Sequence, residues 1–118
     1  MELEALDHVG LVVSDMSRSL RWYQEVLGLR RAYQEAWGEF PAVLEANGSG
    51  VALFPDDGGV PIPADDPMRH VGFRTSRRGL EARGIEFEEG DYGVAWSVYL
   101  PDPDGYQVEI TTYEPASA

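Results

Sequence analysis

The chain contains no cysteine and no lysine, and each absence removes several kinds of chemistry. Without cysteine there are no disulfides, thiolate nucleophiles, iron–sulfur clusters or cysteine-ligated zinc. Without lysine there is no Schiff-base catalysis and no P-loop lysine to bind a phosphate. All nine basic residues are arginines, so the available chemistry rests on carboxylates, hydroxyls, arginines and two histidines.

Long apolar runs and net positive charge are also missing. No run approaches the roughly 20 apolar residues that cross a bilayer. The first residues, Met-Glu-Leu-Glu, lack the features of a signal peptide, so we expect a cytoplasmic protein without membrane association. The net charge is −12, which disfavours nucleic acids and anionic membranes as partners. Such acidity would attract a cationic ligand, although it also simply keeps a protein in solution.

The two histidines mark an internal repeat. His8 and His70 each begin the sequence His-Val-Gly at the head of a strand-like run, about half the chain apart. A repeat at half-length predicts two copies of one folding unit within a single domain, residues 1–118. Equivalent histidines of two related units can converge on a metal ion. The alternative is that each histidine merely fills a buried strand position.

The first half, module 1 (about residues 1–54), reads as β-α-β-β-β. Ser14 and Asp15 offer a helix N-cap, an apolar stripe follows at helical spacing, and Gly28 suits a left-handed C-cap. Turn residues separate the later strands. The expected elements are a strand over 6–13, a helix over 16–27, and strands over 29–37, 42–46 and 50–54.

The second half, module 2 (about residues 68–113), repeats this order with a shorter helix. A loop rich in proline, glycine and aspartate, residues 55–67, joins the halves. The segment Pro-Asp-Pro-Asp-Gly at 101–105 is a strong turn between the last two strands. The expected elements are strands over 69–75, 85–88, 94–100 and 106–112, and a helix over 77–83.

Several motifs together resemble the vicinal oxygen chelate superfamily, which includes glyoxalases, bleomycin resistance proteins and extradiol dioxygenases. They are the two His-Val-Gly strands, the helix that contains Trp22-Tyr23 and ends Val-Leu-Gly-Leu, and the segment Tyr-Leu-Pro-Asp-Pro-Asp-Gly-Tyr-Gln-Val-Glu. The resemblance covers nearly the whole chain. It implies an α+β fold in which two βαβββ modules form an eight-stranded, incompletely closed curved sheet, often with a divalent metal inside.

The resemblance also implies a ligand set. The first-strand histidine of the family matches His8, the fifth-strand histidine matches His70, and the last-strand glutamate matches Glu109. A fourth carboxylate of glyoxalase I-like members has no counterpart, because aligning the repeats puts Ala52 opposite Glu109. Two histidines and one carboxylate suit Fe(II), Mn(II), Zn(II) or Ni(II) and leave positions open for a chelating substrate. The glycines two residues after each histidine would either make room there or allow close packing.

Tyr99 matches the position of an acid/base tyrosine in the ring-cleaving dioxygenases of the superfamily. It is therefore a candidate catalytic residue, with packing as the alternative. Those dioxygenases also need a further active-site histidine, and this chain has none left, which argues against ring cleavage.

Four further residues are candidates for binding substrate. Arg74 shares a strand face with His70 and can pair with an anion, or form an ordinary salt bridge. Ser97 lies two residues before Tyr99 on the same face. Aromatic side chains can line an apolar pocket, and we select Trp96 and Phe54 among them.

Two functions follow as expectations. The first is a small metal-dependent enzyme that chelates a small oxygenated metabolite. The second is a metal-free protein that sequesters a drug, because acidity and aromatic residues together suit a cationic aromatic ligand. A fosfomycin-type activity is less consistent with the strong negative charge, because its substrate is a phosphonate. The short second helix favours a homodimer that covers the module 2 sheet.

Overall fold

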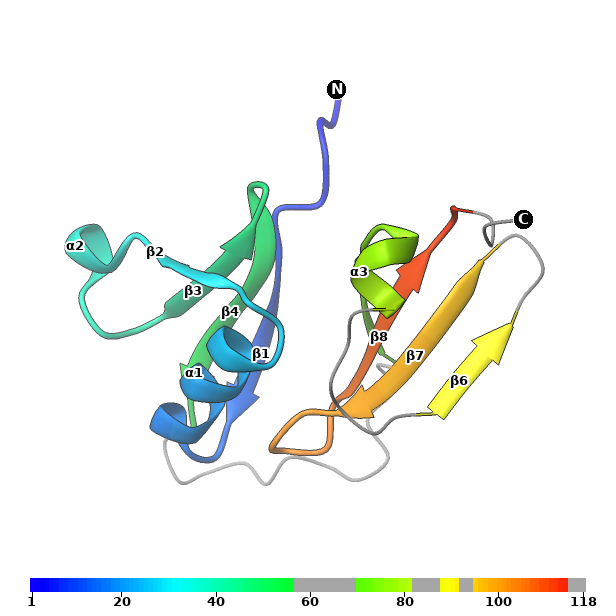
Figure 1. Cartoon of the computed structure of the whole chain (residues 1–118). Coiled ribbons are helices and arrows are strands. Elements are labelled where there is room, and N and C mark those ends of the chain that lie inside the picture. Colours follow the sequence, from blue (N-terminus) through cyan, green and yellow to red (C-terminus); the bar gives the residue numbers. More distant parts are fainter. Residues whose placement is uncertain (57–69, 82–87, 92–94, 115–118) are drawn as a thin grey trace. The chain divides into compact units, whose positions relative to one another are not determined.

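The computed structural model of the protein describes residues 1–56, 70–81, 88–91 and 95–114. The chain divides into two compact units, Met1–Asp65 and Asp66–Ala118, which are described separately (Figure 1). Each unit holds one small sheet and a helix that precedes its later strands. The organisation of both units as one domain stays a prediction.

The sheet of unit 1 has four strands in the order β1-β4-β3-β2. The outer strand β1 runs parallel to β4, and the other neighbours are antiparallel. A two-residue turn at Asn47 and Gly48, both with positive φ, connects β3 to β4. The strands are β1 (His8–Val13), β2 (Arg30–Ala32), β3 (Ala42–Ala46) and β4 (Ser49–Pro55).

Helix α1 (Met16–Glu25) covers one face of this sheet and forms as the sequence predicts. The Asp15 carboxylate accepts a hydrogen bond from the Arg18 backbone N–H at 3.1 Å, as a helix N-cap does. At the other end Gly28 adopts φ +70°, the left-handed conformation that glycine takes without penalty. The core between helix and sheet consists mainly of Leu11, Val13, Tyr23, Leu44, Val51 and Leu53.

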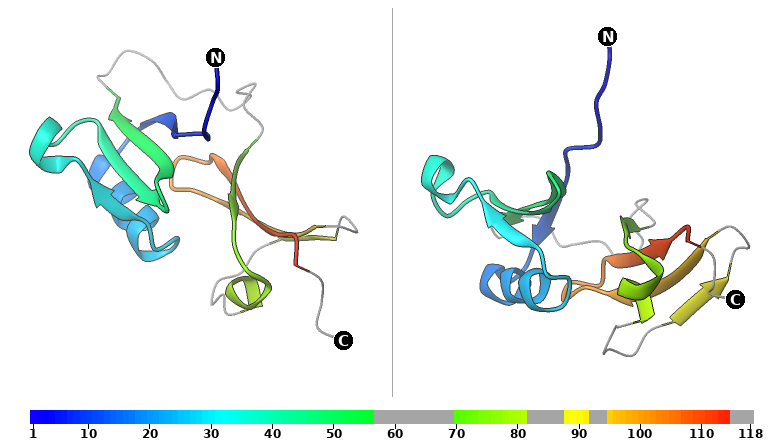
Figure 2. Two further views of the ribbon diagram at one scale, coloured as in Figure 1. Left: turned by 90° about the horizontal axis from the view of Figure 1, so that it is seen from above. Right: turned by 45° about the horizontal axis from the view of Figure 1, so that its top comes forward.

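The strand predicted over 29–37 is wrong in its second half. The strand β2 ends at Ala32, and Gln34–Trp37 forms the short helix α2. Tyr33 stands between them with φ +61°, a left-handed conformation that no strand can contain. Helix α2 follows the end of β2, away from α1 (Figures 1 and 2). The unexpected helix brings Tyr33 and Trp37 together, with ring centroids 4.9 Å apart.

The sheet of unit 2 repeats the topology of the first, in the order β5-β8-β7-β6. Again the first strand runs parallel to the last, and the remaining neighbours are antiparallel. The described strand β6 covers 88–91, whereas a strand was predicted over 85–88, of which residues 85–87 lie outside the described part of the chain. The strands are β5 (Val71–Arg74), β6 (Glu88–Asp91), β7 (Trp96–Pro101) and β8 (Gln107–Thr112).

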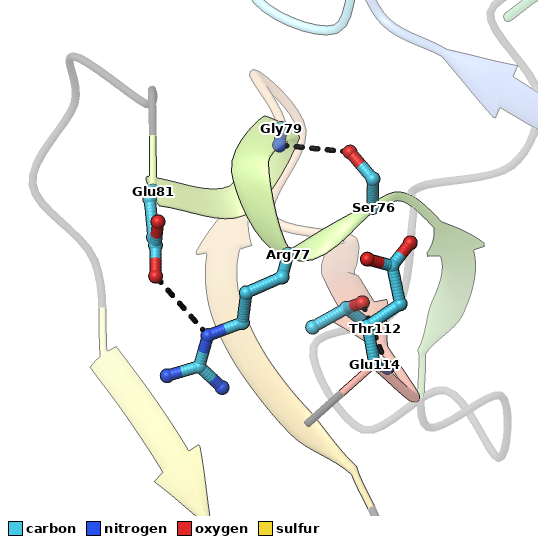
Figure 3. Close-up of polar contacts among 6 residues, drawn as sticks. All are labelled: Ser76, Arg77, Gly79, Glu81, Thr112 and Glu114. Atoms are coloured by element: carbon cyan, nitrogen blue, oxygen red, sulfur yellow. Dashed lines mark hydrogen bonds and ion pairs between the residues drawn. The ribbon is translucent and has the colours of Figure 1, made fainter. Parts of the chain in front are cut away.

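Helix α3 (Arg77–Glu81) packs against β8 and is held at both ends by side chains (Figure 3). The Ser76 hydroxyl accepts a hydrogen bond from the Gly79 backbone N–H at 3.0 Å. Arg77 donates to the Glu81 carboxylate at 3.2 Å, one helical turn further on. Leu80 is fully buried and anchors the helix in the core of unit 2, with Val71, Val98, Leu100 and Val108.

The expected α+β architecture is confirmed. Each unit follows the order β-α-β-β-β, with α2 as an addition in unit 1. The described strands form two four-stranded sheets, neither of which closes on itself. In the described ranges, every helix is too short or too polar to cross a membrane.

Candidate metal centre and adjoining pocket

Strand register shows how the two units correspond. In unit 1, Gly10 of β1 lies opposite Ala52 of β4. In unit 2, Gly72 of β5 lies opposite Glu109 of β8. Each glycine follows its histidine by two residues, so Ala52 and Glu109 occupy the same place in the repeat. The register thus agrees with the alignment made from the sequence.

The turn before β8 determines where Glu109 lies in that strand. The buried Asp102 carboxylate accepts hydrogen bonds from the backbone N–H groups of Asp104 and Tyr106, both at 2.9 Å. The Asp102 N–H donates to the Tyr106 carbonyl at 2.8 Å, which closes the loop at the start of β8. Gly105 has φ +90°, a conformation that favours glycine. This rigid turn fixes which residues of β8 face away from helix α3.

On that open face Glu109 joins a histidine and a tyrosine. The His70 Nε2 atom lies 3.4 Å from Glu109 Oε1, and the Tyr99 hydroxyl donates to Glu109 Oε2 at 2.9 Å. The Glu109 side chain is 16% exposed and that of His70 is 46% exposed. One carboxylate oxygen is thus directed to the histidine while the tyrosine restrains the other. A nitrogen and an oxygen that approach in this way are donors that one divalent ion can share.

Gly72 lies directly beside this pair. A Cβ atom at position 72 would lie in contact with Glu109 Oε1, at 3.4 Å, and would meet no other heavy atom within 4 Å. The absence of a side chain at Gly72 therefore leaves Glu109 Oε1, the oxygen nearest His70, uncovered on this side. Of the two explanations for these glycines, open space next to the carboxylate fits Gly72 better than close packing of backbones.

His8 stands at the equivalent place in unit 1, with a different partner. Its Nδ1 atom lies 2.8 Å from the Asp7 carboxylate, and its side chain is 47% exposed. A carboxylate on one ring nitrogen orients the imidazole and leaves the other nitrogen for a ligand, an arrangement common around metal-binding histidines. Sequence reasoning missed Asp7 as a partner, although it directly precedes His8.

Neither unit by itself gathers three histidine, aspartate or glutamate side chains around one point within the described residues. His70 and Glu109 lie together in unit 2, and His8 lies in unit 1. Histidine and carboxylate are donor types that suit a divalent transition metal. The Asp7 carboxylate contacts the ring of His8, and the Tyr99 hydroxyl donates a hydrogen bond to Glu109. The complete ligand set stays a prediction.

Unit 1 contains a pocket beside His8, on the face of its sheet opposite helix α1. Its volume is about 210 Å³. Ala52, Val43 and Phe54 form its floor, because they share this face with His8 by strand alternation. The aromatic pair from the unexpected α2 region forms a wall. The complete lining consists of Asp7, His8, Tyr33, Trp37, Pro41, Val43, Ala52 and Phe54.

Of the four residues predicted to bind substrate, one lies in unit 1 and three lie in unit 2. Phe54 lines the pocket of unit 1 with His8. Ser97 shares the open face of unit 2 with Glu109 but is fully buried, and its hydroxyl donates to Thr111 at 2.8 Å. Arg74 lies 5.2 Å from the ring centroid of Tyr113, at the end of β5.

Trp96 is not brought together with these residues. It alternates with Ser97 along β7 and so faces helix α3, where the Arg77 guanidinium lies 4.0 Å from its ring centroid. The sequence could have excluded it, since neighbouring residues of a strand point to opposite faces. Among the residues that line the pocket, Tyr33, Pro41 and Val43 were missed. Strand alternation could have indicated Val43, which shares the face of Ala52. Tyr33 could not be found in this way, because the single-turn helix that follows it leaves no periodic signal.

Comparison with known proteins agrees with the fold and the repeat. The sequence model of the glyoxalase/bleomycin resistance protein/dioxygenase superfamily matches residues 5–110. A glyoxylase I of Arabidopsis thaliana is 30% identical, over 93% of this chain and 71% of its own length. Biphenyl-2,3-diol 1,2-dioxygenase 3 of Rhodococcus globerulus is 32% identical, over 89% of this chain and 61% of its own length.

A solved glyoxylase/bleomycin resistance protein/dioxygenase domain from Frankia sp. EAN1pec has the same fold. It superposes with a TM-score of 0.76 at 22% sequence identity, and covers 98% of this chain and 96% of its own. The family model matches nearly all of both units, and the two units share one topology. The chain belongs to the glyoxalase/bleomycin resistance protein/dioxygenase superfamily.

Proposed function

We propose that the protein is a metal-dependent enzyme that binds one divalent ion through His8, His70 and Glu109 and acts on a small oxygenated metabolite. The observation that carries the proposal is the approach of His70 Nε2 to Glu109 Oε1, at 3.4 Å in unit 2. His70 directly precedes β5 and Glu109 lies on the neighbouring strand β8, so this pair would supply two of the three proposed ligands, next to Gly72. His8 is added because it occupies the equivalent position of the repeat.

The bound ion would act as a Lewis acid that polarises two neighbouring oxygens of a chelated substrate. The residues of the chain have separate tasks. Tyr99 restrains one Glu109 oxygen by its hydrogen bond, so that the other stays directed toward His70. Asp7 orients the imidazole of His8 through Nδ1. Tyr99 is thereby a positioning residue, and its hydroxyl is also the group nearest the ligands that can hold a proton.

A titration of metal-free protein with Mn²⁺, followed by calorimetry, tests this proposal. We expect one ion per chain, and a loss of affinity of roughly 100-fold or more in the variants His70→Ala and Glu109→Gln. The variant Glu81→Gln is the matched control, because it removes an equal charge from the exposed end of α3. Equal Mn²⁺ affinity in Glu109→Gln and Glu81→Gln would show that Glu109 is no ligand.

The alternative function, metal-free sequestration of a cationic aromatic drug, is favoured by one observation. The pocket of unit 1 is largely apolar and aromatic, and the Asp7 carboxylate is among the described residues that line it. Bleomycin is a suitable probe, in the presence of a chelator. Tight binding of bleomycin by protein that takes up no Mn²⁺ would favour sequestration over catalysis.

We also propose a homodimer. Helix α3 has only five residues and α1 has ten, so the sheet of unit 2 has less helical cover among the described residues. A second copy of the chain would bury the remaining apolar surface. Light scattering during size-exclusion chromatography should give twice the monomer mass of 13.1 kDa. A monomeric mass at micromolar concentration would refute this.

A further inference from the structure

The pocket of unit 1 has a lining that the proposed metal chemistry does not require. Chelation needs His8, whereas Tyr33, Trp37 and Phe54 contribute rings and no metal ligand. At the equivalent face of unit 2, position 111 is a threonine where unit 1 has Phe54, and position 99 is a tyrosine where unit 1 has Val43. The apolar surface is therefore specific to one copy of the repeat, and the duplication alone does not explain it.

We propose that the substrate carries a single aromatic ring, which binds in this pocket against Trp37 and Phe54, next to His8. The inference rests on the proposed function in one respect, namely that the molecule held there is the one chelated at the metal. The binding of the ring itself depends only on residues of unit 1.

Size favours one ring over a larger system. The pocket volume is about 210 Å³, and an apolar protein cavity of roughly 150 Å³ already accommodates benzene. Aromatic side chains favour an aromatic ligand, because edge-to-face and offset contacts between rings add to the burial of apolar surface. The tilted pair formed by Tyr33 and Trp37, at 39° between ring planes, offers both a face and an edge.

Polarity sets the orientation of such a ligand. A carboxylate and an imidazole lie together at one end of the pocket, because Asp7 directly precedes β1 and His8 begins it. The polar groups of the aromatic wall are the hydroxyl of Tyr33 and the indole N–H of Trp37. We therefore place the ring against Trp37 and Phe54, and its oxygen substituents toward His8. No arginine is among the described residues that line the pocket, and the Asp7 carboxylate would repel a carboxylate on the ring. A neutral ring substituent suits this environment better than an anionic one.

The backbone around the wall is held in an unusual conformation. Tyr33 has φ +61°, which side-chain-bearing residues adopt rarely. The Arg31 guanidinium donates to the Glu39 carbonyl at 3.0 Å and ties the ends of the segment together. Such local conformations persist where the surrounding structure enforces them, and they concentrate at ligand-binding positions.

Benzyl alcohol is the probe for this proposal, in metal-free protein with a chelator present. Backbone amide and Trp37 indole NMR signals report its position, and a dissociation constant of about 1 mM is expected for a ligand of this size. Cyclohexylmethanol tests the preference for an aromatic ring, and benzoate tests the preference for a neutral one. Both should bind more weakly than benzyl alcohol.

The variant Trp37→Leu should weaken benzyl alcohol binding by about tenfold. Phe40→Leu is the matched control: Phe40 lies in the same segment with comparable exposure, 48% against 53%, but does not line the pocket. Equal affinities of the two variants, or shifts confined to residues outside the pocket, would overturn the inference. So would tighter binding of cyclohexylmethanol or benzoate.

The two proposals fail separately. Mn²⁺ binding without a benzyl alcohol shift in the pocket refutes the aromatic substrate and leaves the metal centre in place. A benzyl alcohol shift that Trp37→Leu weakens, in protein that takes up no Mn²⁺, supports the ring site and refutes the metal-dependent function.

Discussion

The open faces of the two sheets differ although their strands follow the same course. In unit 1 the row opposite Gly10 reads Ala52 and then Val43. In unit 2 the row opposite Gly72 reads Glu109 and then Tyr99. One copy has become an apolar surface and the other a hydrogen-bonded polar cluster. The two copies of the repeat thus present surfaces of different chemistry, apolar in unit 1 and polar in unit 2.

On the covered faces, the position next to this row is alike in both units. Val51 in unit 1 and Val108 in unit 2 occupy matching registers, and both are fully buried. Each lies between its sheet and its helix, where packing tolerates little change. At this point of the repeat, the change from Ala52 to Glu109 therefore affects only the face that carries the histidines.

The largest expected effect concerns the two cores. Leu53 and Ile110 occupy the same place in the repeat, but Leu53 is fully buried whereas Ile110 is partly exposed. Leu53→Ala should lower the free energy of unfolding by about 3–4 kcal/mol, because it leaves a cavity under α1. Ile110→Ala should cost about 1–2 kcal/mol. Urea denaturation measures both, and equal losses would mean that the unit cores are packed equally well.

The second effect concerns the turns that lead into β4 and β8. Unit 1 uses two residues of positive φ, whereas unit 2 relies on the Asp102 carboxylate. Asp102→Ala leaves two backbone N–H groups without their acceptor and should cost about 2 kcal/mol of stability. Asp102→Asn retains an acceptor oxygen and should cost less than about 1 kcal/mol. Thermal unfolding distinguishes these values, and equal losses would exclude the two hydrogen bonds as the cause.

The third prediction concerns Tyr99, which contacts Glu109 on the open face of unit 2. Tyr99→Phe removes the hydrogen bond to Glu109 Oε2 and keeps the ring, so the Mn²⁺ affinity should fall by about tenfold with little change in stability. A merely packing tyrosine would leave the Mn²⁺ affinity unchanged. The variant Tyr113→Phe is the control, since its ring contacts Arg74 and lies away from Glu109.

The smallest effect concerns the helices. Arg77 bridges the Trp96 ring and the Glu81 carboxylate in unit 2, contacts between exposed or partly exposed groups. Arg77→Met keeps the aliphatic stem and should cost about 0.5–1 kcal/mol. The loss should shrink in 1 M salt, because screening weakens the charged contacts. A loss that is independent of salt would assign the effect to packing of the stem.

The regular elements of the fold could be predicted because several local signals agreed. Helix α1 has a capping aspartate, a terminal glycine and an apolar stripe, and each signal lies where the structure uses it. The segment over 33–37 had no such agreement. This segment was predicted as the end of a strand, whereas Tyr33 adopts a left-handed conformation that local sequence patterns do not predict.

The candidate site was predictable to a similar degree. The pair His70 and Glu109 could be named because the resemblance to the superfamily pointed to both residues, and strand alternation agrees with a shared face for Gly72 and Glu109. The partner of His8 and the aromatic wall could not, because they depend on a rotamer of Asp7 and on the single-turn helix α2. The alternation of side chains along a strand predicts the face of the sheet to which each side chain points. It does not predict which residues of a neighbouring loop that side chain contacts.

The turn held by Asp102 has a consequence for how this chain can change. Between Tyr106, whose N–H that carboxylate binds, and Glu109 there is room for only two residues. Insertion or deletion of one residue there would move every side chain of β8 to the other face of the sheet. The carboxylate of Glu109 would then lie under α3, and a valine or isoleucine would be exposed on the open face. Length in this segment is therefore under stricter constraint than composition, and natural variants should differ here by substitution alone.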